Sequence, residues 1–456
     1  MKKKAYVLLC ALGGSMVQVC AASEKAGGDF TTFRQDRAAY EDVAWDKVKE
    51  TQRSAVSTGR GFVRQTWVVS PSLNPDVAGL GPTYNRPSCI SCHPHNGRGQ
   101  PPEVYGEPMR SMLVRLSVPG VDAFGGPRHE LNYGDQLNEF GVPGVAGEGE
   151  ARIEWVSLNK ILSDGESITL RYPKVTFHKL AYGPLDNAAM YSPRVASVIY
   201  GLGLLEAVPE ADILAIADEQ RREGKGIAGT ANRVWDVAKQ ASVLGRFGWK
   251  ANQPTVRQQI AAALVGDMGI TTPLFPQPNC PPSQAACTAQ KADIHPELSN
   301  ETLDKMALYH YTLAVPARRD VDMPAVKHGE KLFTEIGCSG CHRPSLKTGD
   351  FPVHPALAGQ LIHPYTDLLV HDMGEELADG RPDGMANGRQ WRTSPLWGMG
   401  LLEKINEHTT LLHDGRARNP LEAILWHDGE AQDARVRFEQ LNKADREAVI
   451  AFLMSL

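Results

Sequence analysis

The pentapeptide Cys-x-x-Cys-His occurs twice in this chain of 456 residues, at residues 89–93 and at residues 338–342. The pattern is typical of c-type haem attachment, in which two thiols three residues apart bond to the two vinyl groups of one porphyrin. The following residue, His93 or His342, is then the proximal iron ligand. A zinc half-site would need two more nitrogen or sulfur ligands nearby, and a thioredoxin-like pair does not carry a fused His. The residues predicted to bind two haems covalently are Cys89, Cys92, Cys338 and Cys341.

The N-terminus has the pattern of an export signal, which c-type attachment requires in bacteria. Three Lys residues are followed by an apolar stretch and by small residues, so residues 1–22 are predicted to be a signal peptide. A lipoprotein anchored at Cys20 is the alternative, but Val19 is disfavoured before an anchored cysteine. No later stretch has the roughly 20 apolar residues of a membrane helix. The sequence therefore predicts a periplasmic protein without a transmembrane segment.

Two cysteines remain once the motifs and the signal peptide are set aside. Cys280 and Cys287 lie in a Pro-rich loop, and an oxidising compartment favours a disulfide between them. The alternative is a reactive thiol pair, which would need an electropositive setting that the loop lacks.

The charge of the chain limits its partners. The formal net charge is −5, and removing residues 1–22, with three Lys and no acidic residue, brings it to −8. An acidic protein is a poor match for nucleic acid and suits a small basic electron donor, such as a cytochrome c or a cupredoxin.

The spacing of the motifs predicts one haem domain in each half. We expect a mainly α fold with two cytochrome c-like domains, at residues 23–320 and 321–456. Amphipathic spacing predicts a helix over 325–337 that leads into the second motif, and Asn442 resembles the N-cap of the last helix.

An internal repeat divides the chain in the same way. Residues 200–206 read Tyr-Gly-Leu-Gly-Leu-Leu-Glu and residues 397–403 read Trp-Gly-Met-Gly-Leu-Leu-Glu. The first copy lies about 50 residues further from its motif than the second, which indicates an insertion in the first domain. Apolar residues alternate with period two at 112–118 and 168–172, so the insertion, at about 110–180, is predicted to be β-rich.

Several separate blocks carry a family resemblance. Residues 365–374, 391–398 and 412–417 resemble the di-haem oxidoreductase family, whose members are described as peroxidases, and residues 79–82 and 245–250 add to the match. More distantly, the chain is similar to bacterial di-haem cytochrome c peroxidases and MauG-type enzymes. The resemblance implies an oxidoreductase in which one haem receives electrons and the other reacts with hydrogen peroxide or another small oxidant.

The resemblance also implies a sixth ligand for the second haem. In those relatives it stands fourteen residues after the His of a His-Asp-Gly turn, and counting from His413 reaches His427. The relatives have Met or Tyr there, so His427 departs from them in residue type; Met373 is the alternative. We expect His413 and Arg416 to orient a ring or to meet a haem propionate.

The first haem has no matching ligand in the sequence. The offset of 197 between the repeat copies carries His427 onto Thr230, and no His occurs from 179 to 294. The first haem is therefore predicted to be open or weakly closed, and to be the site of peroxide chemistry. The remaining side chains that could close it are His95, His129, His178, Met109, Met112 and Met190.

Peroxide cleavage needs a group that moves a proton and a donor that stabilises charge. The candidates in and near the insertion are Glu103, Gln136, Glu148 and Glu154. Trp249, Trp391 and Trp397 could relay electrons between the haems.

Calcium is not predicted. Relatives often carry an acidic loop near the equivalent of 218–229, but here the cationic residues Arg221, Arg222 and Lys225 oppose a divalent cation. Two other functions stay open: a pure electron-transfer cytochrome with both haems six-coordinate, and a thiol oxidoreductase that uses Cys280 and Cys287.

Overall fold

The computed structural model describes residues 24–290 and 296–456, so the predicted signal peptide, residues 1–22, lies outside the described residues. Only 33% of the chain is helical and 19% is strand, and the expectation of a mainly α protein is therefore wrong. The strands form several small sheets rather than one. Among the described residues, no helix combines the length and the apolar character that crossing a membrane requires.

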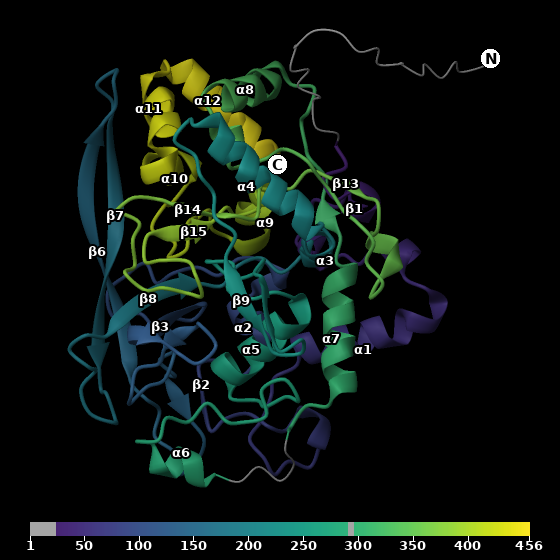
Figure 1. The fold of residues 1–456 in the computed structure, drawn as a ribbon, viewed down its shortest axis with the longest axis vertical. Helices are drawn as coiled ribbons and strands as arrows, with labels where there is room; N and C mark the ends of the chain where they lie inside the picture. Colours follow the sequence, from purple (N-terminus) through teal and green to yellow (C-terminus); the bar gives the residue numbers. More distant parts are fainter. Residues whose placement is uncertain (1–23, 291–295) are drawn as a thin grey trace.

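Helices are spread through both halves of the chain (Figure 1). They are α1 (Arg53–Arg64), α2 (Cys89–Cys92), α3 (Leu202–Glu206), α4 (Glu210–Glu223), α5 (Val256–Met268), α6 (Ala285–Ala289), α7 (Asn300–Thr312), α8 (Pro324–Glu335), α9 (Leu402–Asn406), α10 (Pro420–Leu425), α11 (Gln432–Gln440) and α12 (Lys443–Ser455). The predicted N-cap of α12 is confirmed, because the Asn442 side chain accepts a hydrogen bond from the amide of Asp445.

Most strands are short, and the long ones lie in the first half. They are β1 (Thr31–Thr32), β2 (Thr83–Tyr84), β3 (Met112–Val121), β4 (Pro127–Arg128), β5 (Phe140–Gly141), β6 (Glu150–Ile161), β7 (Ser167–His178), β8 (Met190–Val195), β9 (Arg233–Asp236), β10 (Ala241–Leu244), β11 (Val315–Pro316), β12 (Leu346–Lys347), β13 (Leu361–Ile362), β14 (Val370–Asp372) and β15 (Gln390–Arg392).

Strands β3, β6 and β7 lie where the alternating pattern predicts a β-rich insertion. β3 pairs with β8 and β4, and β6 pairs with β7 along their whole lengths. The predicted alternation holds in β3, where Met112, Val114 and Leu116 are buried. In β7 it holds less well, because Leu170 is buried while Tyr172 is exposed on an outer face of the hairpin.

Each half is closed by a pair of crossing helices with a glycine at the contact. A side chain at Gly59 in α1 would overlap the carbonyl oxygen of Lys305 in α7. A side chain at Gly329 in α8 would overlap the carbonyl oxygen of Ala448 in α12 in the same way. Only glycine allows the two backbones to approach this closely. The α1–α7 pair and the α8–α12 pair are therefore equivalent elements of the two halves.

The two copies of the internal repeat pack against each other. A side chain at Gly201 would overlap the Trp397 ring, and one at Gly398 would overlap Tyr200. The Tyr200 hydroxyl donates a hydrogen bond to the Trp397 carbonyl oxygen at 2.9 Å. The largest apolar core contains residues from both sides of the expected boundary at residue 320. The repeat thus forms the seam between the halves.

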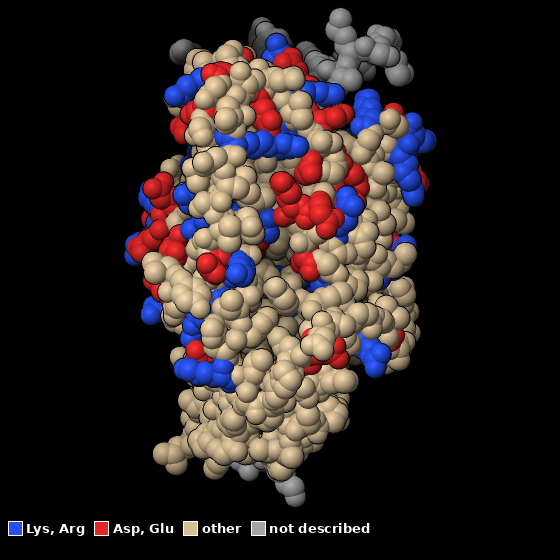
Figure 2. Space-filling model, turned by 90° about the vertical axis from the view of Figure 1, so that its left-hand side faces the viewer, with Lys and Arg blue, Asp and Glu red and all other residues tan. Residues whose placement is uncertain are grey.

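The β6–β7 hairpin reaches from the first half onto the second. Figure 1 shows it along one side of the molecule, passing α10 and α11. Near its tip, Leu162 is buried in the same cluster as Leu425 and Trp426. Arg446 of α12 pairs with Asp164 at 2.6 Å and with Glu166 at 2.8 Å. Figure 2 shows that Lys, Arg, Asp and Glu residues are intermixed over the upper part of this side, so no patch of a single sign dominates it.

Candidate functional site

Both Cys-x-x-Cys-His motifs line one cavity. Its volume is about 1880 Å³, whereas a pocket for a single small ligand is usually about 300 to 1,000 Å³. The four motif cysteines carry no disulfide. The cavity is therefore large enough to hold more than one bulky group beside the two motifs.

The proximal histidines are held in the same way in the two halves. The Nδ1 atom of His93 lies 2.6 Å from the carbonyl oxygen of Ser197, and Nδ1 of His342 lies 2.9 Å from that of Tyr365. A hydrogen bond from Nδ1 fixes the ring and leaves Nε2 available to a metal. Burial lowers the pKa of His342 to about 4 and also lowers the pKa of His93, so both rings are neutral near pH 7. Neutral imidazole is the form that binds iron.

His427 faces His342 across the cavity. Its Nδ1 lies 2.7 Å from the carbonyl oxygen of Ala423 in α10, which leaves its Nε2 free in turn. The two ring centres are 6.5 Å apart. Two imidazoles bound to opposite sides of one metal ion, with bonds of about 2.0 Å, have ring centres about 6 to 6.5 Å apart. The geometry favours His427 as the sixth ligand of the second haem, which stays a prediction.

Two other candidates for that position also line the cavity. His371 is occupied on both sides of its ring, by Asp367 at 2.8 Å and Glu430 at 2.7 Å. Burial lowers the pKa of His371, but the Asp367 carboxylate and the Cys341 sulfur outweigh it and raise the pKa well above the usual value, so the ring is charged. Both ring nitrogens have an acceptor, so neither is free. Met373 remains the alternative to His427, because it also borders the cavity.

The side chains named for the first haem are mostly elsewhere. Only His129 and Met112 line the cavity, and Met112 is buried in an apolar cluster at the start of β3. His95 is turned toward Glu41, with Nδ1 3.1 Å from a carboxylate oxygen. Thr230, the position reached by the offset of 197, forms a backbone bridge with Val370 and is not part of the cavity wall.

His310 lines the cavity and was missed in the sequence. It lies near the end of α7, with its Nδ1 2.7 Å from the Met306 carbonyl oxygen, and burial lowers its pKa to about 4. The segment from 179 to 294, which has no His, ends before α7 begins. Since Lys305 and Ala448 are equivalent at the glycine contacts, His310 corresponds to Leu453 of α12, which also lines the cavity.

The expected acid and amide candidates do not line the cavity. Glu154 is exposed and lies 3.8 Å from Lys174. Gln136 is buried, and its amide donates to Gly266 and Asp267. Neither position favours contact with a group bound in the cavity.

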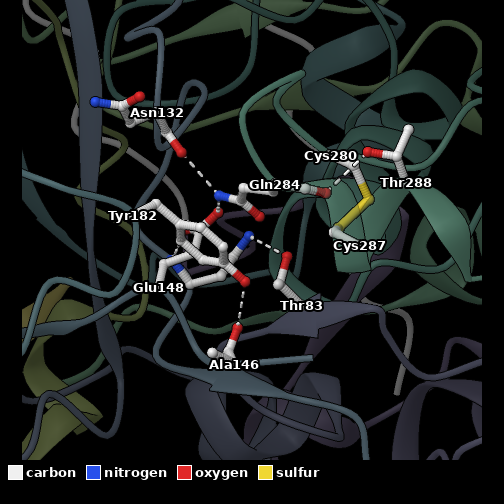
Figure 3. The surroundings of a disulfide bond; sticks show 10 residues. Thr83, Asn132, Ala146, Glu148, Tyr182, Cys280, Gln284, Cys287 and Thr288 are labelled. Carbon is white, nitrogen blue, oxygen red and sulfur yellow. Dashed lines mark hydrogen bonds between the residues drawn. A yellow bond between two sulfur atoms is a disulfide. The ribbon is translucent and has the colours of Figure 1, made fainter. Parts of the chain in front are cut away.

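Glu148 is buried beside the disulfide instead (Figure 3). Cys280 and Cys287 are bonded, and the Gln284 amide between them donates to Glu148 at 2.7 Å. The amide of Asn138 donates to the other carboxylate oxygen at 2.6 Å. Burial outweighs these hydrogen bonds and raises the pKa of Glu148 to about 8. Glu148 thus links the disulfide loop, through Gln284, to the segment that contains Asn138. Glu103, the fourth candidate, pairs with Arg171 at 2.5 Å.

Unpaired guanidinium nitrogens on the cavity wall fit the carboxylates of a haem. Four arginine residues each have a buried guanidinium nitrogen without a hydrogen-bond partner among the described residues, although the protein interior normally satisfies such donors. A planar guanidinium suits a carboxylate particularly well. The residues concerned are Arg98, Arg343, Arg392 and Arg435.

His413 belongs to an aromatic stack on the cavity wall. Its ring lies 3.6 Å from that of Trp391 and nearly parallel to it, and Lys250 approaches the Trp391 ring to 4.4 Å. Asp414 binds Arg416 at 2.7 Å and lies 3.4 Å from His413. This arrangement fits the expected orienting role of His413 and Arg416. Trp249, Trp391 and Trp397 all line the cavity.

A family model covers the blocks at 245–250, 365–374, 391–398 and 412–417 but not the block at 79–82. This model, which matches residues 180–456, is described as "Di-haem oxidoreductase, putative peroxidase". No curated protein and no solved structure matches the chain.

Proposed function

We propose that this chain, which belongs to the di-haem oxidoreductase family, binds one c-type haem at each motif and uses them to reduce a small oxidant such as hydrogen peroxide. The observation that carries the proposal is that both motifs line one cavity while, among the described residues, only the proximal candidate His342 has a ring contact with a second histidine. A closed haem is suited to electron transfer and an open one to chemistry. The haem held by His342 and His427 would then supply electron transfer, and the haem held by His93 would supply the reaction with the oxidant.

The motif residues would hold the groups. Cys89 and Cys92 would form thioethers to the first haem, and Cys338 and Cys341 to the second. When bound, the haems supply one-electron transfer and, where a coordination position is open, reaction with an oxidant. His93 and His342 are kept neutral and correctly oriented by the carbonyl oxygens of Ser197 and Tyr365.

The arginines of the wall support the same assignment. Arg98 and Arg392 each keep a buried nitrogen without a partner in the described part of the chain. A haem carboxylate would neutralise this charge, which is otherwise costly in a buried setting. The pKa of each is lowered to about 10, chiefly by burial.

The electron donor in this proposal is a small basic protein of the periplasm, a cytochrome c or a cupredoxin. The acidic net charge of the chain would speed its encounter with such a donor, and the rate should fall as salt is added.

The test is hydrogen peroxide consumption by the purified full-length holoprotein with a reduced small cytochrome c as donor. We expect turnover, a covalent haem stain with twice the intensity of a mono-haem standard, and loss of one haem equivalent in the double variant Cys89→Ala, Cys92→Ala. The double variant Cys280→Ser, Cys287→Ser should keep its turnover. If the protein holds two haems but does not oxidise the donor when peroxide is added, it is a pure electron-transfer cytochrome. If turnover is lost only in the Ser double variant, a thiol oxidoreductase is favoured.

A further inference from the structure

A second internal repeat connects the two halves around the cavity. Phe247 and Gln253 form an isolated antiparallel bridge, and Leu411 and Ala417 form another. The positions differ by 164 in both pairs. The residues joined by each bridge are six apart, so the two turns have the same length.

The same offset continues into the following helices. Thr255 caps α5 by accepting a hydrogen bond from the amide of Gln258, and Asn419 caps α10 by accepting one from Glu422. The caps are again 164 residues apart, and so are the first residues of the helices. An equal turn followed by an equally placed cap fixes the direction in which each helix leaves its turn.

Counting 164 back from His427 reaches Ala263. Both residues line the cavity. The offset of 164 is smaller than the 197 of the first repeat. The second half has 33 fewer residues between its copy of that repeat, at 397–403, and the turn at 411–417. Ala263 has no atom that can bind iron.

We infer that Ala263 holds in the first half the position that His427 holds in the second, so that the haem face opposite His93 has no protein ligand and forms a binding site for a small ligand such as peroxide or cyanide. The inference deepens the proposed function and rests on its haem at residues 89–93. Most of α5 borders the cavity, and Ala262, Ala263 and Gly266 are its small residues there, beside the larger Ile260, Leu264 and Val265.

Gln259 adds one polar group to the wall. It lies one helical turn before Ala263, on the same face of α5, and borders the cavity. Its Oε1 atom is buried and has no hydrogen-bond partner within the described ranges. A bound ligand that carries a proton would satisfy this oxygen.

His310 is the competing ligand, and its place in the fold argues against it. His310 and Leu453 are each five residues beyond the carbonyl group that contacts the helix-crossing glycine. In the second half that position is apolar, while the face opposite His342 belongs to His427. By this equivalence His310 takes the place of Leu453 and not that of His427, although it lies near enough to His93 for the two rings to interact electrostatically.

The test is Ala263→His in the full-length holoprotein, followed by electron paramagnetic resonance and optical spectra with and without cyanide. We expect the high-spin signal of the first haem to become low-spin and its cyanide affinity to fall by more than tenfold. The matched control Ala263→Leu adds similar bulk without a nitrogen, so the haem should remain high-spin. A folded Ala263→His protein with the spin state of the wild type would overturn the inference.

Two further measurements apply even where Ala263→His does not fold. Ala263→Leu should lower the cyanide affinity of the first haem at least tenfold and leave the second haem unchanged; equal affinity contradicts the inference. A first haem that is low-spin in the wild type and becomes high-spin in His310→Leu or Met112→Leu also contradicts it. Gln259→Leu should slow the reaction of the first haem with hydrogen peroxide, whose protons the Oε1 atom can accept, without changing the spin state.

The outcomes separate this inference from the proposed function. If Ala263→His switches the spin state but the wild type does not consume peroxide, the open site stands and the peroxidase proposal fails. If peroxide is consumed and the spin state does not respond to position 263, the proposal stands and the site lies elsewhere.

Discussion

The two halves of the molecule use the same elements around the cavity but differ on one face. Each has a glycine-mediated helix crossing, a motif whose histidine is held by a backbone carbonyl, and a capped helix after a short turn. In the second half that helix leads to His427, and in the first it presents Ala263. On the proposed function, one side chain of a duplicated scaffold would decide whether the haem of each half is closed or open.

The largest expected effect is that of His427→Ala, which would make the second half resemble the first. The second haem would lose its sixth ligand, so its low-spin signal should disappear and electron transfer from the donor should slow by at least about tenfold. Added imidazole should restore the low-spin signal. A spectrum identical to that of the wild type would exclude His427 and turn attention to Met373.

Alanine at the two crossing glycines tests whether the two helix crossings are equivalent in stability. Each added methyl group overlaps a carbonyl oxygen of the facing helix, so Gly59→Ala and Gly329→Ala should each cost about 3 kcal/mol of unfolding free energy. Urea denaturation measures this. Gly61→Ala is the matched control in α1, because a side chain there meets nothing within 4 Å. A cost at only one of the two glycines would show that the crossings are not equivalent.

Glu148 has no counterpart in the second half, and it should give the first half a pH dependence. Its pKa is raised by burial from 4.5 to about 8, so the folded state binds more protons than the unfolded state between these values. The contribution of Glu148 to stability is therefore complete below about pH 4.5 and decreases as the pH rises to about 8. The wild type should lose about 1.4 kcal/mol of unfolding free energy per pH unit in this range, a few kcal/mol in all, and Glu148→Gln should not show this loss. Melting curves from pH 5 to pH 8 measure it, and equal slopes in the two proteins would contradict the prediction.

The smallest effect is expected at Glu154. Its side chain is 53% exposed and outside the cavity wall, so Glu154→Gln should change peroxide turnover less than about twofold. Glu154→Gln is also the control for Glu148→Gln in the melting curves, because it removes an exposed carboxylate instead of a buried one. A larger loss of turnover would restore the insertion as a source of catalytic groups.

The parts of the site that depend on short sequence patterns could be predicted. The motifs, the N-cap Asn442 and the β-rich character of 112–118 are all local, whereas His427 depends on a spacing that the family resemblance implies, and its role as a ligand stays a prediction. The fold class could not be predicted, because strands of two residues such as β1 and β11 pair across distant parts of the chain and leave no periodicity. Ala263 could not be predicted because the offset between the two halves changes from 197 to 164 along the chain. His310 could not be predicted because α7 packs in the first half although its sequence lies near the second motif.

The contact of the β6–β7 hairpin with α12 and with the cluster around Trp426 makes the halves unsuitable for study as separate pieces. A protein cut at residue 320 would lose the partner of Arg446 and uncover Leu425 and Trp426, directly beside His427. The spectrum of an isolated second half would therefore report a haem environment that the complete chain does not have. Changes at the hairpin tip, in the sequence of the first half, should likewise be read as changes to the second haem.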